Sequence, residues 1–177
     1  MPYKYRKSDN GATWWLGDVD VPLYRYAEAL LIYAEAQNEL GNTGVAVQYL
    51  NMIRARARKG TGAQARTEPH DYGTAGEAMD KLSVRDAIFM ERAWEFAFET
   101  KRWFDLVRRD SEEPGYWKSS LIAHDPNFDQ TPPNPKPLPD EYKKRWPIPQ
   151  AQIDANPALC QNPGYGGTAC PPGVTVP

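Results

Sequence analysis

The stretch from Asp86 to Arg109, DAIFMERAWEFAFETKRWFDLVRR, combines the most apolar bulk of the chain with its densest charge. Its apolar residues leave almost no wholly polar face, so a helix here must pack on several sides. The same stretch places Glu91, Glu95 and Glu99 four residues apart, on one side of such a helix, and we call these three residues the acidic ridge. Stacked like charges repel and burial raises the cost steeply, so cations from elsewhere in the chain must neutralise them.

Two helices are predicted upstream of the acidic ridge. Apolar residues recur at helical spacing over residues 22–40, with proline suiting the first turn and Gly41-Asn42 ending the helix. The second helix covers residues 44–58, and the short connection predicts an antiparallel helical hairpin. The tetrad YAEA occurs twice in the first helix, seven residues apart, and its alanines permit a close approach of the second helix.

Arginines of this hairpin are the nearest cations in the sequence. Arg54 and Arg58 share one face of the second helix, whereas Arg56 lies on the opposite face. Arg25 of the first helix and Arg102, just after the ridge, are further candidates. We therefore interpret the three glutamates as an ion-pair ridge held by arginines, with Arg54, Arg58 and Arg25 as its principal partners.

The remaining helices are predicted around the ridge itself. Ser83 followed by Asp86 resembles a capping box, which predicts a helix over residues 84–99. A fresh apolar set behind Lys101 predicts a separate helix over residues 101–109. Before them, residues 59–82 form a long loop rich in Gly, Thr and Ala, and loops of this length in helical domains are often functional.

Prolines dominate the sequence after residue 109. They include the run PPNPKPLP at residues 132–139, so an irregular strap and tail are predicted over residues 110–177. Such a run is either a rigid connector or a ligand for the groove of another protein, and connectors are commoner. The chain as a whole is therefore predicted to be all-α, as a single domain of 177 residues.

Composition excludes several classes of function. A formal net charge of -2 gives no basic footprint for nucleic acid. The longest apolar run is too short to cross a bilayer, and the residues after Met1 show neither an apolar signal core nor a cleavage site. The two cysteines are too few for a disulfide scaffold and have no histidine near them, so no metal site and no cofactor are expected.

Six blocks of sequence, in this order, resemble the C-terminal part of a known family. They are RYAEALLIYAEAQNELGN (25–42), LNMIRARA (50–57), RDAIFMERAWEFAFETKRWFDLVRR (85–109), WPIP (146–149), IDANP (153–157) and QNPGY (161–165). Together they resemble the SusD/RagB-like proteins, which are surface nutrient-binding lipoproteins of Bacteroidetes.

This resemblance implies an all-helical protein built on tetratricopeptide-like hairpins, although residues 22–58 depart from the usual consensus of that repeat. It implies non-catalytic binding of glycans, or sometimes peptides, at the outer-membrane surface, and delivery to a SusC-like TonB-dependent transporter. Full-length members are much longer and begin with an acylated cysteine. The chain is therefore expected to be a fragment whose partners include the missing N-terminal portion. The alternative is an interaction module that docks on the transporter without touching the nutrient.

An enzyme is the less favoured interpretation of the acidic ridge. Neighbouring ridge carboxylates match the spacing of a retaining glycosidase, but catalytic acids need a cleft and these are flanked by large rings. His70 and His124 are both predicted in loops, where a lone histidine is usually solvated. No catalytic residue is therefore predicted.

Glycan binding requires flat aromatic faces that stack on sugar rings, beside polar groups for the hydroxyls. Aromatic residues in predicted loops are the candidates, with Asn10, Asp71 and Asp125 as polar neighbours. The candidate rings are Trp14, Trp15, Tyr72, Tyr116 and Trp117. The alternative is that these rings fill gaps beneath loops or pack against the missing portion.

The last motifs are predicted to be structural. Prolines 147 and 149 fix an extended segment, and Asn162-Pro-Gly164 predicts a tight turn that lets Tyr165 fold back. Cys160 and Cys170 would close a short loop by a disulfide if the protein is exported, since the cell exterior is oxidising.

Overall fold

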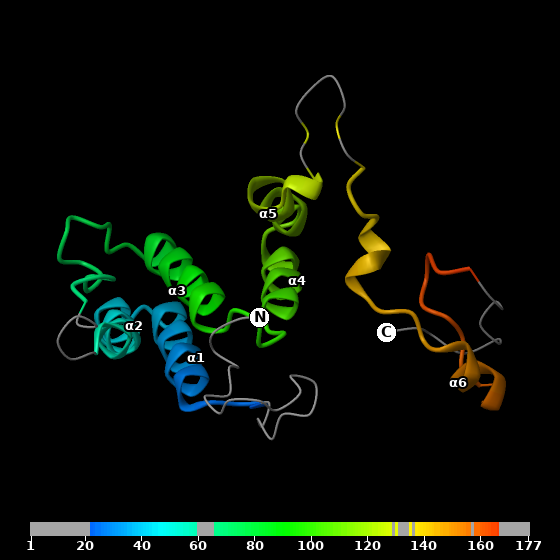
Figure 1. Cartoon of the computed structure of the whole chain (residues 1–177), viewed down its shortest axis with the longest axis horizontal. Coiled ribbons are helices and arrows are strands. Elements are labelled where there is room, and N and C mark those ends of the chain that lie inside the picture. The colour runs from blue at the N-terminus through cyan, green and yellow to red at the C-terminus, as the bar shows by residue number, and fades with distance from the viewer. Residues whose placement is uncertain are drawn as a thin grey trace, which may run out of the picture. The chain divides into compact units, whose positions relative to one another are not determined.

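The computed structural model describes residues 22–59, 66–128, 130, 135, 137–156 and 158–166 (Figure 1). Their regular structure is helical throughout, which confirms the predicted all-α class. The chain divides into two compact units, Met1–Asp105 and Leu106–Pro177, and each is described by itself; the predicted single domain stays a prediction. No helix in this described part is both long and apolar enough to span a membrane.

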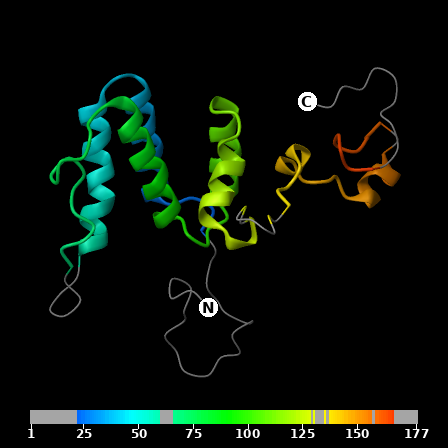
Figure 2. The same cartoon turned by 90° about the horizontal axis from the view of Figure 1, so that it is seen from above.

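The first unit is a three-helix layer made by α1 (Tyr26–Glu39), α2 (Thr43–Arg58) and α3 (Lys81–Glu95). The three lie side by side in both views, and each contacts the other two (Figures 1 and 2). Side chains from all three fill the core between them. Those that are almost fully buried are Leu31, Ala34, Ala46, Leu50, Ile53, Val84 and Ile88.

The α1/α2 hairpin depends on alanine at the helix contact. Ala34 of α1 and Ala46 of α2 have no exposed surface, and Ala27 is also buried. The first alanine of each YAEA tetrad therefore faces the core, while the second, Ala29 or Ala36, is exposed. Only one alanine of each tetrad is thus used for close helix packing within this unit.

Two helix starts differ from the prediction. The first helix begins at Tyr26 rather than at residue 22, because Arg25 at its N-cap adopts an extended backbone. The third begins at Lys81 rather than 84, because Asp80 accepts hydrogen bonds from the backbone N–H of Leu82 and Ser83 and so caps α3. Ser83 lies in the first turn and donates its hydroxyl to Asp80 instead of serving as the cap.

The end of α3 also differs from the prediction. The helix stops at Glu95, so Glu99 lies in a turn rather than on the helix predicted to reach residue 99. Phe98 and Thr100 adopt left-handed backbone angles, with φ of 65° and 58°. Helix α4 (Arg102–Glu112) then begins, close to the predicted break.

Segments of the second unit are helical where an irregular strap was predicted. Besides the end of α4, it contains α5 (Tyr116–His124), η3 (Pro126–Phe128), η4 (Glu141–Lys144) and α6 (Gln150–Ala155). The start of α5 is fixed by Asp110, whose Oδ1 accepts from the N–H of Gly115 at 3.0 Å and of Trp117 at 2.8 Å. Gly115 permits this turn, since its φ is 95°.

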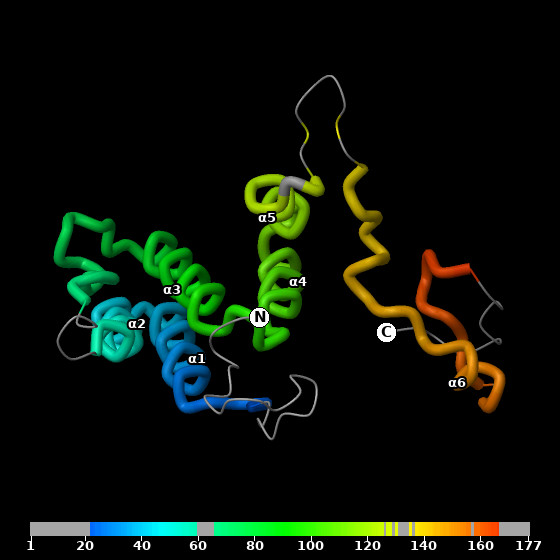
Figure 3. The backbone as a smooth tube through the Cα atoms, in the orientation of Figure 1, coloured from blue at the N-terminus to red at the C-terminus, as the bar shows by residue number. Residues whose placement is uncertain are grey.

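The motifs WPIP and QNPGY bind each other. The side-chain amide of Gln161 accepts a hydrogen bond from the backbone N–H of Ile148 and donates one to its carbonyl, both at 2.8 Å. It thus satisfies both backbone groups of Ile148, as a neighbouring strand would. Asn162 donates to the carbonyl of Trp146 at 2.7 Å. The predicted turn is present, because the N–H of Tyr165 bonds the carbonyl of Asn162. The tube in Figure 3 shows the chain doubling back after α6.

Gly164 provides a test of this contact between the WPIP and QNPGY motifs. Its φ is 92°, and a Cβ would lie 2.3 to 2.6 Å from atoms of Tyr142. We expect Gly164→Ala to lower the free energy of local opening by about 1 to 3 kcal/mol, measured by hydrogen exchange at the Ile148 amide. Gly166→Ala is the matched control, because nothing lies near its Cβ position. Equal exchange rates in the two variants would show that the contact between the two motifs does not depend on Gly164.

Candidate functional site

The first pair of the acidic ridge is buried. Arg54 Nε lies 2.9 Å from Glu91 Oε2, and the two side chains are only 8% and 5% exposed. Burial raises the pKa of Glu91, while the hydrogen bond from Arg54 opposes that rise. The pair joins α2 to α3 inside the core, where an unpaired charge is very unfavourable.

Arg25 holds the other two carboxylates of the ridge. Its Nη2 lies 2.8 Å from Glu95 Oε1, and its Nε and Nη2 each lie 2.9 Å from an oxygen of Glu99. These contacts raise the pKa of Arg25, chiefly through the hydrogen bond to Glu99. The residue just before α1 thus binds the end of α3 and the turn that follows it.

Two other arginines have partners that differ from the predicted ones. Arg58 does not join the ridge: it lies 2.6 Å from Asp71 and donates to the carbonyl of Pro69. Arg56, predicted on the opposite face, lies 2.5 Å from Glu95, which its long and half-exposed side chain reaches around the helix. Glu95 therefore has two arginine partners.

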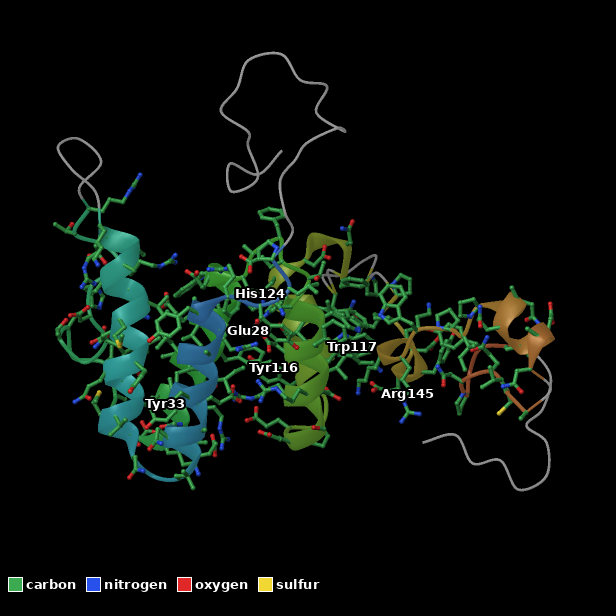
Figure 4. The ribbon with its side chains drawn as sticks, turned by 90° about the horizontal axis from the view of Figure 1, so that it is seen from below. Glu28, Tyr33, Tyr116, Trp117, His124 and Arg145 are labelled. Atoms are coloured by element: carbon green, nitrogen blue, oxygen red, sulfur yellow. The ribbon has the colours of Figure 1, made fainter. Side chains whose placement is uncertain are left out.

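A second charge cluster was missed from the sequence. Arg92 Nε donates to both oxygens of Asp105 at 3.0 to 3.1 Å, and Lys101 Nζ lies 3.1 Å from Glu28 of α1 (labelled in Figure 4). Among the described residues, Arg92 Nη1 is buried without a hydrogen-bond partner. The spacing in the sequence could have predicted that Arg92 is buried, because it lies four residues after Ile88, on the helix face that meets the core.

Phe96 lies between the two clusters. The guanidinium carbons of Arg25 and Arg92 lie 5.2 and 5.3 Å from its ring centroid. The ring is 3% exposed, so these cation–π contacts form in a largely desolvated setting. Phe96 thus links the acidic ridge to the Arg92 cluster through one buried ring.

Two of the predicted sugar-binding rings are buried, so their predicted exposure is wrong. Tyr72 is 9% exposed and donates its hydroxyl to the carbonyl of Ala78. Trp117 is fully buried, with the ammonium of Lys144 5.4 Å from its ring (Figure 4). Tyr72 is buried within its loop and Trp117 within α5, so both rings pack inside the protein, as in the alternative interpretation.

The other predicted site residues have different settings. Tyr116 is half-buried, and the guanidinium of Arg109 lies 4.9 Å from its ring. Asp71 is engaged by Arg58, and Asp125 accepts from the N–H of Asn127. Asn10, Trp14 and Trp15 lie outside the described residues.

The cysteines and histidines complete the predicted set. Cys160 is buried, whereas Cys170 lies outside the described residues, so their disulfide stays a prediction. His70 is in a loop as predicted, but His124 is the last residue of α5. No group of three or more possible metal ligands occurs among the residues described.

Removal of one ridge carboxylate tests its burial. Glu91→Ala leaves Arg54 buried without a counter-charge, so we expect a loss of about 3 kcal/mol in the free energy of unfolding by urea titration. Glu39→Ala is the matched control, because Glu39 pairs with Arg85 at 2.6 Å on the exposed surface. It is expected to cost less than about 1 kcal/mol. Similar losses in both variants would show that the ridge is solvated.

Comparison with known proteins covers most of this chain. The model of the SusD family matches residues 1–165. SusD-like protein P2 of Formosa agariphila is 36% identical over 142 residues, which are 80% of this chain and 25% of that protein. SusD-like protein P25 of the same organism is 32% identical over 148 residues, covering 81% of this chain and 24% of that protein.

The fold is similar to a solved one as well. A crystal structure of a SusD superfamily protein from Bacteroides vulgatus matches with a TM-score of 0.59 and 27% sequence identity, over 82% of this chain and 27% of that one. The chain spans about a quarter of the length of the curated relatives that it matches. On these matches, and with the helical fold described above, the chain belongs to the SusD family.

Proposed function

We propose that this chain is the C-terminal helical scaffold of a non-catalytic, lipid-anchored surface protein that binds nutrient glycans. The protein delivers oligosaccharides to a SusC-like TonB-dependent transporter in the outer membrane. Membership of the SusD family supports this role, and so does the charge pairing of the acidic ridge.

The pairing of the ridge is the observation that carries the non-catalytic assignment. A glycosidase needs one carboxyl that stays protonated and a second that is ionised beside it. Glu95 and Glu99 both lie against the guanidinium of Arg25, at 2.8 and 2.9 Å, so both carboxylates are already held in ion pairs. Glu91 has a raised pKa, but its side chain is 5% exposed and bound to Arg54, so a sugar has no access to it.

Contact with the glycan is assigned to fewer rings than the sequence suggested. Tyr72 and Trp117 are excluded because they are buried. Trp14, Trp15 and Tyr116 remain the proposed stacking residues, and Tyr116 is half-buried. An aromatic ring stacked on a sugar contributes roughly 1 kcal/mol or more.

A second candidate function is favoured by the same burial. With Tyr72 and Trp117 buried, two of the five candidate rings are withdrawn from contact with a sugar. In this alternative the chain is an interaction module that docks on the transporter and touches no nutrient. The two candidates differ in whether the isolated chain binds oligosaccharides.

Isothermal titration of the full chain with a panel of oligosaccharides separates these functions. We expect a saturable response to one glycan class, weakened roughly tenfold by Trp14→Ala, Trp15→Ala or Tyr116→Ala. Tyr24→Ala is the control, since this exposed tyrosine lies beside Lys101 and outside the proposed set.

Binding to a transporter without any response to glycans would favour the interaction module. Release of reducing sugar that is lost in Glu95→Gln would contradict the non-catalytic assignment.

A further inference from the structure

Residues 68–78, which we call the His70 loop, lie between α2 and α3 and are fixed to α2 by hydrogen bonds. Arg54 Nη1 donates to the carbonyl of His70 at 3.1 Å. Asn51 accepts from the N–H of Tyr72 at 2.7 Å and donates to its carbonyl at 3.1 Å. The base of this loop is therefore anchored on the same arginine that neutralises Glu91.

His70 is held between two carboxylates. Its Nδ1 lies 3.1 Å from Glu68 Oε2, and its Nε2 contacts Glu77 Oε1. An ionised carboxylate only accepts hydrogen bonds, so both ring nitrogens must carry a proton for both contacts to form. The arrangement thus requires an imidazolium. The His70 side chain is 43% exposed, which gives water access for proton exchange.

Glu77 connects the imidazolium to the backbone of the loop. While Oε1 faces His70, its other oxygen accepts from the N–H of Gly73 at 3.1 Å and of Ala75 at 2.9 Å. Gly73 has a φ of 89°, so the turn capped by Glu77 is a specific left-handed conformation. If His70 loses one proton, one of its ring nitrogens presents a lone pair to the carboxylate of Glu68 or Glu77. The ion pair that holds Glu77 over this turn is then lost.

We infer that His70 is a proton-operated latch: its imidazolium closes the His70 loop by holding Glu77 on the Gly73–Ala75 turn, and deprotonation releases that turn. This device is separate from glycan binding. It makes the order of one loop of the first unit depend on pH within the range in which histidine titrates.

The sign of the pH dependence follows from the two partners. The hydrogen bond to Glu77, and then that to Glu68, raises the pKa of His70 above its ordinary value of 6.5. The latch contribution is therefore complete below about pH 6.5 and disappears as pH rises through the raised pKa. At the acid end, the pKa of Glu77 is lowered to about 2, chiefly by His70, so the contribution disappears as pH falls toward that value.

Other charged groups surround the latch. Besides the two glutamates they are Arg54, Arg58 and Asp71, with the neutral phenol of Tyr72 and, beside that phenol, Asp80. The two arginines come from α2, and arginine is not a group whose charge changes in the range in which histidine titrates. The pH-dependent step is consequently assigned to His70 and not to its arginine neighbours.

Nuclear magnetic resonance of the full chain tests the latch directly. We expect the His70 ring protons to titrate with a midpoint above 6.5, and the protection of the Gly73 and Ala75 amides to fall with the same midpoint. Protection here means the exchange rate relative to the intrinsic rate at each pH. The fall is expected to be about tenfold for each pH unit by which the His70 midpoint is raised.

Glu77→Gln removes the charge that raises this midpoint. In that variant the His70 midpoint should drop, and protection of Gly73 and Ala75 should no longer vary with pH. Glu112→Gln is the control, because Glu112 is an exposed acid of α4 and belongs to the second unit. A His70 midpoint at or below 6.5 in the unmodified chain, or amide protection that is constant across its titration, would overturn the inference, whether or not the variant folds.

Discussion

One guanidinium binds the first unit at the turn that follows α3, where two residues have left-handed backbone angles. Arg25, just before α1, bonds both oxygens of Glu99 at 2.9 Å and also contacts Glu95. Between these glutamates the chain leaves α3 and passes through Phe98 and Thr100 in left-handed conformations. Each such residue costs on the order of 1 kcal/mol, and the bidentate contact with Arg25 holds the turn in this conformation. The connection to α4 depends on this contact.

The same principle recurs in the core, and it explains why helices so densely charged pack together. Arg54 neutralises Glu91, and Arg92 neutralises Asp105, each through side chains that are less than a tenth exposed. Buried pairs add little net stability over apolar residues, but any packing that separates them leaves a bare charge inside. The charges therefore fix the alignment of α1, α2 and α3, while the apolar residues supply most of the driving force. A support of this kind suits binding without chemistry.

Local patterns in the sequence predict the helices of the first unit, with shifted ends, but neither the helices after α4 nor the positions of long side chains. The hairpin followed from periodicity and from its short connection. Arg58 was assigned to the ridge because it shares a face with Arg54, yet spacing cannot reveal that Asp71 lies over the last turn of α2. The sequence predicts Tyr72 and Trp117 in exposed loops. Both rings are buried instead, and Asn51 and Asp110 accept hydrogen bonds from their backbone N–H groups, which spacing along the chain does not reveal.

The acidic ridge is a structural ion-pair network, and a double-mutant cycle between Arg25 and Glu99 is the most direct test of this role. Arg25→Met, Glu99→Gln and the double variant are unfolded by urea, and the free energies of unfolding are compared. We expect a coupling energy of about 1.5 to 3 kcal/mol between the two residues, because the Glu99 side chain is 2% exposed. Losses that add to within about 0.5 kcal/mol would contradict it, since independent residues behave in that way.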